Sequence, residues 1–84
     1  MKLIRSQDKL KLINTAYIDY IDVSPQIDGR KKETGSVDID VRLTPHELVW
    51  PIGTYRTQNE AIRQLNALTE FLSSSETSGL YEMP

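Results

Sequence analysis

The stretch that decides the fold is Pro51-Ile-Gly-Thr-Tyr-Arg-Thr-Gln-Asn-Glu-Ala-Ile62, because an extended segment passes here into a helix. Thr57 and Glu60 have the T-x-x-E spacing of a capping box. In that motif the Thr hydroxyl accepts a hydrogen bond from the N–H of the Glu, and the Glu carboxylate accepts one from the N–H of the Thr. The sequence therefore predicts strands first and one helix, from about residue 58 to residue 73 or 74, last.

The predicted helix is amphipathic. Its apolar arc, at helical spacing, contains Ala61, Ile62, Leu65, Leu68, Thr69 and Leu72. Phe71 lies off the edge of this arc, and a fully exposed Phe forfeits about 1.5–3 kcal/mol of possible burial. We therefore expect a loop, the C-terminal segment or another subunit to cover Phe71.

The chain before the helix is predicted to form about five strands. The clearest is 37–43, in which Val37, Ile39, Val41 and Leu43 alternate with polar residues, as in a strand with one buried and one wet face. The others are 3–5, 10–13, 16–24 (ended by Pro25) and 47–55, in which Pro51 indicates an edge strand or a bend. The predicted fold class is α+β, with a mostly antiparallel sheet of about five strands packed on one C-terminal amphipathic helix. The apolar face of 37–43 should meet Ile62, Leu65, Leu68 and Leu72.

The 84 residues predict one domain, over residues 1–75, followed by a flexible C-terminal tail over residues 76–84. The polar run Ser73–Gly79 ends the helix, and Leu80-Tyr81-Glu82-Met83-Pro84 follows it. Three interpretations of this tail stay open. It is disordered, it folds back over Phe71 or a sheet edge, or it docks in a partner.

Composition excludes several classes of protein. The chain has no cysteine, which excludes disulfides and thiolate metal sites, and its net charge is −2. Its longest apolar run, Leu48-Val49-Trp50, is far too short for a secretory signal or a membrane span. We expect a cytoplasmic protein without a membrane association. A basic excess is slight and confined to residues 1–34, so nucleic acid is an unlikely partner.

No catalytic, cofactor-binding or metal-ligating residues are assigned from the sequence, and we expect that the protein is not an enzyme. The phosphate-binding glycine loop, G-x-S-x-G and H-E-x-x-H are absent. His46 is the only histidine and is interpreted as a solvated turn residue. Asp38 and Asp40, with Asp19 or Asp22, suggest a hard-cation site, but the glycine-bearing loop of such sites is missing. A solvated sheet face is the favoured interpretation.

The leading hypothesis for function is a non-enzymatic protein–protein interaction or oligomerisation module, whose partner is another protein or a second copy of the chain. The candidate partner-binding residues are Phe71, Leu80, Tyr81 and Met83. The strand aromatics Tyr17, Tyr20, Trp50 and Tyr55 are interpreted mainly as core and rim, with a partner surface on the second sheet face as the alternative.

The second hypothesis for function is a weak nucleic-acid-binding protein that uses the N-terminal strands and the basic tip at residues 30–32. Its candidate residues are Arg5, Lys9, Lys11, Arg30, Lys31 and Lys32. So few phosphate contacts would give weak binding that depends strongly on salt.

Three motifs, at the two ends of the chain and along the helix, form a set. They are Ile4-Arg5-Ser6-Gln7-Asp8-Lys9, then Gly53-Thr54-Tyr55-x-Thr57 leading into Ala61-x-x-x-Leu65-x-x-Leu68-x-x-Phe71-Leu72, and finally Tyr81-Glu82-Met83-Pro84. With this set the chain resembles a group of short uncharacterised proteins that are common in Gram-positive bacteria and their phages. The resemblance implies a small sheet with a C-terminal helix in a cytoplasmic or phage-encoded protein. It carries no activity, but it favours a role for the Tyr-x-Met-Pro segment.

Overall fold

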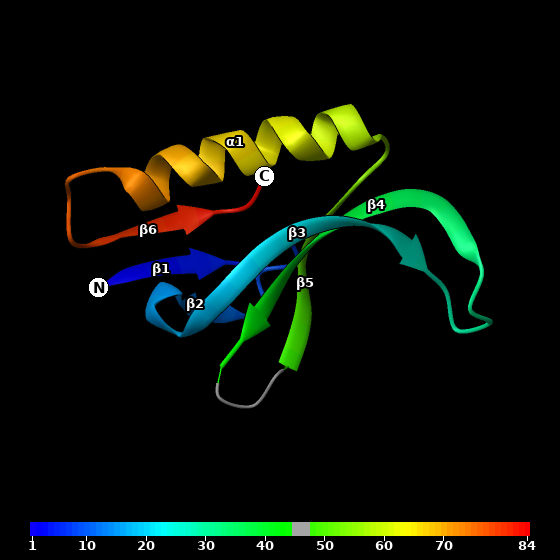
Figure 1. Cartoon of the computed structure of the whole chain (residues 1–84), viewed down its shortest axis with the longest axis horizontal. Helices are drawn as coiled ribbons and strands as arrows, with labels where there is room; N and C mark the ends of the chain where they lie inside the picture. Colours follow the sequence, from blue (N-terminus) through cyan, green and yellow to red (C-terminus); the bar gives the residue numbers. More distant parts are fainter. Residues whose placement is uncertain (45–47) are drawn as a thin grey trace.

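The computed structural model describes residues 1–44 and 48–84, and the chain is α+β (Figure 1). In chain order the elements are β1 (Lys2–Arg5), β2 (Leu12–Asn14), a 3-10 turn (Thr15–Tyr17), β3 (Ile18–Ile27), β4 (Glu33–Leu43), β5 (Leu48–Tyr55), α1 (Gln58–Ser73) and β6 (Gly79–Glu82). His46, predicted as a solvated turn residue, lies outside the described residues. No helix in the described ranges is long and apolar enough to cross a membrane.

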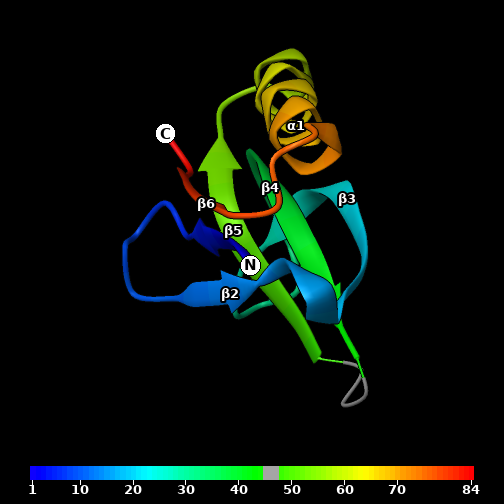
Figure 2. The same cartoon turned by 90° about the vertical axis from the view of Figure 1, so that its left-hand side faces the viewer.

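The strands form two three-stranded sheets, and not the single sheet of about five strands that the sequence predicts. One sheet has the order β2-β1-β6 and the other the order β3-β4-β5. The difference arises at β1, which pairs antiparallel with β2 and parallel with β6. Since the two ends of the chain pair with each other, the N-terminal hairpin β1–β2 joins the C-terminal strand β6 and does not extend the β3-β4-β5 sheet (Figure 2).

β4 is the central strand of the β3-β4-β5 sheet, which has the longer strands and which we call the larger sheet. The alternation of apolar and polar residues over 37–43 predicts this position. Ile39 and Val41 are buried, and Val37 and Leu43 are partly buried against the core. β3 continues through Pro25 to Ile27, so the prediction that Pro25 ends this strand is wrong. Proline is tolerated there because β3 is an edge strand, whose outer side needs no ladder donor.

β5 is also an edge strand, and its ladder with β4 shifts register where Pro51 lies. Asp40 pairs with Pro51, whereas Ile39 pairs with Gly53, so Ile52 is the extra residue and is buried. The prediction of an edge strand or a bend at Pro51 is therefore confirmed.

α1 begins where the sequence predicts. The Thr57 hydroxyl accepts a 3.1 Å hydrogen bond from the N–H of Glu60, but the reciprocal bond from the N–H of Thr57 to the Glu60 carboxylate does not form within the described residues. On the predicted apolar arc, Ala61 and Leu68 are buried and Leu65 is partly buried. Ile62, in contrast, is 38% exposed, so its predicted place in the core is corrected.

The C-terminal segment folds back beside β1 and under the end of α1 (Figure 1). Residues 79–82 of the predicted flexible tail form β6, so the fold-back alternative is the one that the structure shows. The Phe71 and Tyr81 ring centroids are 5.5 Å apart, and Met83 is only 3% exposed. Lys2 Nζ lies over the same Phe71 ring and donates to the Phe71 carbonyl at 2.8 Å, where a cation complements the helix C-terminus.

Candidate protein-binding surface

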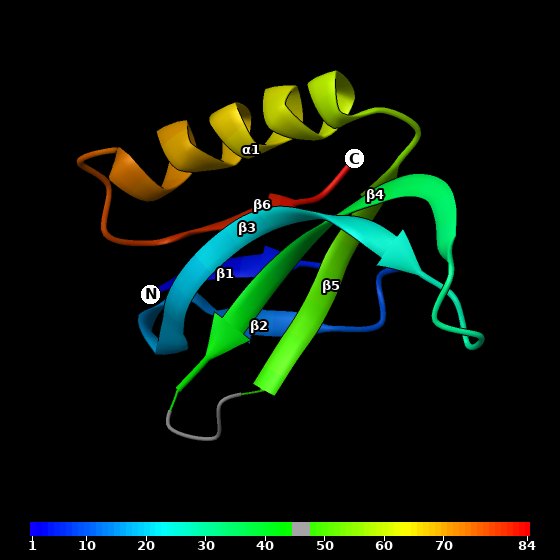
Figure 3. The same cartoon turned by 45° about the vertical axis from the view of Figure 1, so that its right-hand side comes forward.

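The two sheets approach each other at both ends of β4. The helix α1 covers only one of these two ends. Near the helix N-terminus, Val37 of β4 lies close to Gln58. The opposite end of β4 and the start of β5 lie away from the helix (Figure 3), and Leu43 there lines a groove together with Leu12 and Ile13 of β2. We call the first the closed end and the second the open end.

A groove of about 270 Å³ lies at the open end, between β2 and the β4–β5 pair. We call it the Trp50 groove, and its lining residues are Lys11, Leu12, Ile13, Leu43 and Trp50. Trp50 pairs with Val41 across the ladder, and directly paired residues share a face, so the indole lies on the inner face of its sheet. It nevertheless remains 38% exposed.

Lys11 is the charged side chain of this groove. Its Nζ lies 5.1 Å from the centroid of the Trp50 ring, within the range of a cation–π interaction. It forms an ion pair with Oδ2 of Asp8 at 4.0 Å, and Lys11 Nζ makes no hydrogen bond to the described part of the chain. The groove therefore combines apolar walls with a cation that makes no hydrogen bond within the described residues.

The residues that the sequence nominated for partner binding are mostly used within the chain itself. Met83 is buried, and Phe71 and Tyr81 pack on each other and on the core. Leu80 differs from them because it is 47% exposed. Of this set, Leu80 alone presents a largely exposed apolar side chain to a partner.

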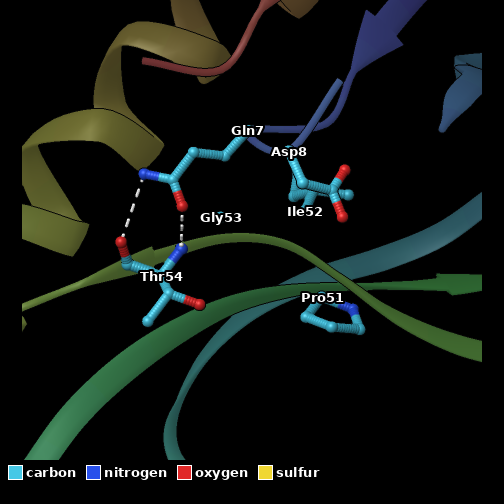
Figure 4. A pocket seen from close by; sticks show the side chains of 6 residues that line it. All are labelled: Gln7, Asp8, Pro51, Ile52, Gly53 and Thr54. Atoms are coloured by element: carbon cyan, nitrogen blue, oxygen red, sulfur yellow. Dashed lines mark hydrogen bonds between the residues drawn. The ribbon is translucent and has the colours of Figure 1, made fainter. Parts of the chain in front are cut away.

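The closed end is organised by Gln7, which extends the edge of β5 (Figure 4). The N–H of Gln7 donates to the carbonyl of Ile52 at 2.7 Å. Its side-chain amide accepts from the N–H of Thr54 at 2.8 Å and donates to the carbonyl of Thr54 at 3.2 Å. The same amide donates to Pro84 O at 2.9 Å. One side chain thus joins the β1–β2 turn, β5 and the C-terminal segment.

Gly53 and Tyr55 complete the closed end. A Cβ at Gly53 would come within 2.7 Å of the Tyr55 hydroxyl, so this close approach requires glycine. The Tyr55 hydroxyl donates to Pro84 O at 3.2 Å, and burial raises the pKa of Tyr55. The three motifs that carry the resemblance therefore meet at one place. A hollow of about 110 Å³ remains there, between Gln7 and residues 51–54, but Gln7 and Thr54 already hydrogen-bond each other across it.

The polar β1–β2 turn explains why Gln7 is held in place. Asp8 Oδ1 accepts from the Ser6 hydroxyl at 2.6 Å and from the N–H of Leu10 at 2.9 Å. The hydrogen bond from Ser6, followed by that from Leu10, lowers the pKa of Asp8. Lys9 takes a positive φ of 65°, which closes the turn. Ser6, Asp8 and Lys9 of the sequence motif are thus explained by turn geometry.

The basic residues of the second hypothesis come from separate elements. Arg5 of β1 lies 3.3 Å from Glu82 of β6, and Lys11 lies over Trp50. Lys9 belongs to the β1–β2 turn, whereas Arg30, Lys31 and Lys32 form the β3–β4 turn, which Asp28 Oδ1 holds by accepting from the N–H groups of Arg30 and Lys32. The arrangement does not concentrate these charges on one element.

The aspartates of the predicted wet face lie on the outer face of the larger sheet. Asp22 pairs with Asp40, Ser24 donates to Asp40 at 2.6 Å, and Thr54 donates to Asp38 at 2.6 Å. Partial burial raises the pKa of Asp40, against the hydrogen bond from Ser24, and the charges of Asp38 and Asp22 add to the increase. Within residues 1–44 and 48–84, no three His, Cys, Asp or Glu side chains are placed to hold a metal ion.

Sequence reasoning named Trp50 and Lys11 separately but did not bring them together, and it missed Leu12 and Leu43 as parts of the same surface. The aromatic residues also divide differently from the second-face alternative, because Trp50 lies on the inner face and Tyr20, paired with Arg42, on the outer one. The only signal in the sequence is an apolar Leu-Val-Trp run on a predicted edge strand. Compared with protein-family models, curated proteins and solved structures, the chain has no match.

Proposed function

We propose that this chain is a non-enzymatic protein-interaction module that binds its partner through the Trp50 groove. The observation that carries the proposal is the partly exposed indole of Trp50 in an apolar groove, beside the ammonium group of Lys11, which makes no hydrogen bond within residues 1–44 and 48–84. Tryptophan is enriched among the residues that dominate binding energy at protein interfaces. Leaving this side chain half-covered forfeits burial that a partner would supply.

The size of the groove favours side chains of a protein over a metabolite. Small-molecule sites usually enclose about 300–1,000 Å³ and bury most of the ligand. The Trp50 groove, at about 270 Å³, is smaller than this and open to solvent on one side. It suits one or two apolar side chains that belong to a larger partner surface.

The sheet edges support the proposal less well than the groove does. Exposed edges invite pairing with another chain, but short strands, prolines and bulges prevent it. β2 and β6 are only three and four residues long. β3 carries Pro25 and two register shifts, and β5 carries Pro51 and is occupied by Gln7. Edge pairing is thus disfavoured at each of these edges.

Binding experiments with two matched aromatic variants test the proposal. Trp50→Ala removes the indole of the groove, whereas Tyr20→Ala removes an aromatic ring of comparable exposure from the outer face of the same sheet. Proteins captured from the organism that encodes the chain are identified with each variant, and the affinity for each purified candidate is then measured. Sedimentation velocity with the same variants detects binding to a second copy.

We expect Trp50→Ala to weaken binding by at least tenfold, and Tyr20→Ala to change it less than threefold, as for a hot-spot residue and a residue outside the interface. Leu80→Lys serves as a third variant, since Leu80 is the exposed member of the candidate set from the sequence. Full binding by Trp50→Ala would reject the groove as the interface. Loss of binding by Leu80→Lys alone would instead place the interface on the outer face of the β2-β1-β6 sheet.

A further inference from the structure

We infer that the occupant of the Trp50 groove is a peptide segment with a large apolar side chain next to a carboxylate, and not a second copy of this chain. This inference rests on the function proposed above and specifies the chemistry of the partner. It follows from the charge of the groove, the hydrogen-bonding state of Lys11 and the self-repulsion of this patch in a two-fold dimer.

Lys11 favours a carboxylate because its ammonium group lies at the groove and has only a long ion pair, to Asp8 Oδ2 at 4.0 Å, within the described residues. The Trp50 ring lies on one side of Nζ, with its centroid 5.1 Å away. Asp8 does not compete strongly, since its Oδ1 is used by Ser6 and Leu10 and its Oδ2 reaches only to 4.0 Å from Nζ. An ammonium group has three donors, and hydrogen bonds between ionised partners are roughly twice as strong as neutral ones.

The remaining walls select for an apolar side chain. Leu12, Ile13, Leu43 and Trp50 offer no charged group to the groove, and Ile13 is itself part of the buried core. An apolar residue that enters the groove removes these walls from water. The carboxylate of the neighbouring peptide residue then lies next to Lys11, where fewer water molecules screen the attraction between the two charges.

A second copy of the chain fits this chemistry poorly. One apolar and acidic segment of the chain, Tyr81-Glu82-Met83, is already held by the pairing of β6 with β1. Glu82 lies 3.3 Å from Arg5 and Met83 is buried, so presenting this segment to another molecule would unpair β6 from β1. In a two-fold dimer the same patch meets itself, which brings two copies of Lys11 toward each other.

A peptide-display selection followed by titration tests the inference. Random heptapeptides are selected on the full chain, and each selected sequence is synthesised with its acidic residue and with the matching amide, Glu→Gln or Asp→Asn. Trp50 is the only tryptophan of the chain, so its intrinsic fluorescence reports occupation of the groove directly by peptides without tryptophan. The protein variants are Lys11→Met, which keeps an aliphatic stem over Trp50 but removes the charge, and Lys9→Met as the matched control in the same turn.

We expect the selected peptides to carry a large apolar residue beside Asp or Glu and to bind about five- to tenfold more tightly than their amide counterparts, with a preference that falls as salt rises. Lys11→Met should abolish this preference and Lys9→Met should keep it. Selected peptides without acidic residues, or a preference that survives Lys11→Met, would overturn the inference and leave the proposed function standing. A Trp50-dependent dimer without peptide binding would also overturn the inference and leave the proposed function standing. Absence of both peptide binding and any Trp50-dependent partner would reject both proposals.

Discussion

The closed end and the open end of this molecule use similar residues in opposite ways. At the closed end, Gln7 joins three segments by four hydrogen bonds, and the Tyr55 hydroxyl shares Pro84 O with it. At the open end, Lys11 finds no acceptor within the described residues, and Trp50 stays 38% exposed. The two sheets therefore form a hydrogen-bonded junction at the closed end. At the open end they leave a partly exposed aromatic side chain and a lysine without a hydrogen bond among the described residues.

This contrast separates stability from binding. A small domain has little free energy of unfolding to lose, so polar groups at a structural junction need partners. Exposed apolar side chains and hydrogen-bond donors without partners are typical of surfaces that another molecule covers on binding. Residues of the closed end should thus control unfolding, whereas residues of the open end should control association.

The largest effect should come from Leu68→Ala, in the core beneath α1. Leu68 is fully buried, and truncation of such a leucine costs about 2–5 kcal/mol of the free energy of unfolding through lost burial and a cavity. Leu65→Ala, at a partly buried position of the same helix, should cost less. Urea denaturation measures both. An equal cost at the two positions would show that the helix does not pack as described.

Gln7→Ala should have the next largest effect. It removes three side-chain hydrogen bonds and leaves the N–H and carbonyl of Thr54 without their partner, for a cost of about 2 kcal/mol. Lys11→Met at the open end should change the free energy of unfolding by less than about 1 kcal/mol, the usual worth of an exposed cation–π contact. A larger loss for Lys11→Met than for Gln7→Ala, in urea denaturation, would reverse the comparison between the two ends.

The smallest effect should come from Asp40→Asn, on the outer sheet face between the two ends. Burial raises the pKa of Asp40 above its usual 3.8, so the folded state holds this proton more tightly than the unfolded state does. The contribution of Asp40 to stability therefore decreases as pH rises from about the usual value through the raised one.

Thermal unfolding of Asp40→Asn at two pH values measures this contribution. At pH 7 the asparagine removes a partly desolvated charge that lies near Asp38 and Asp22. At pH 3 the carboxyl group is already largely protonated in the folded state. The variant should accordingly gain a slightly higher Tm relative to the parent chain at pH 7 than at pH 3. A gain confined to pH 3 would mean that the hydrogen bond from Ser24 outweighs desolvation.

Local features of the sequence were sufficient for the elements that depend on them. The T-x-x-E spacing located the start of α1, and the hydroxyl of Thr57 caps it. Alternation over 37–43 identified the central strand, and Pro51 identified an irregular edge. These patterns act between residues that are close in the chain, so no knowledge of the fold was needed to interpret them.

The sequence by itself determined the α+β class, the helix and its cap, and the strand whose two faces differ. Only the tertiary structure decided that the strands divide into two sheets, that residues 79–82 pair in parallel with β1, and that Lys11 lies over Trp50. The physical reason is that a parallel pairing between the chain ends, and a groove between two sheets, depend on contacts between distant residues. A propensity or a local period carries no information about which distant partner a strand or a side chain will meet.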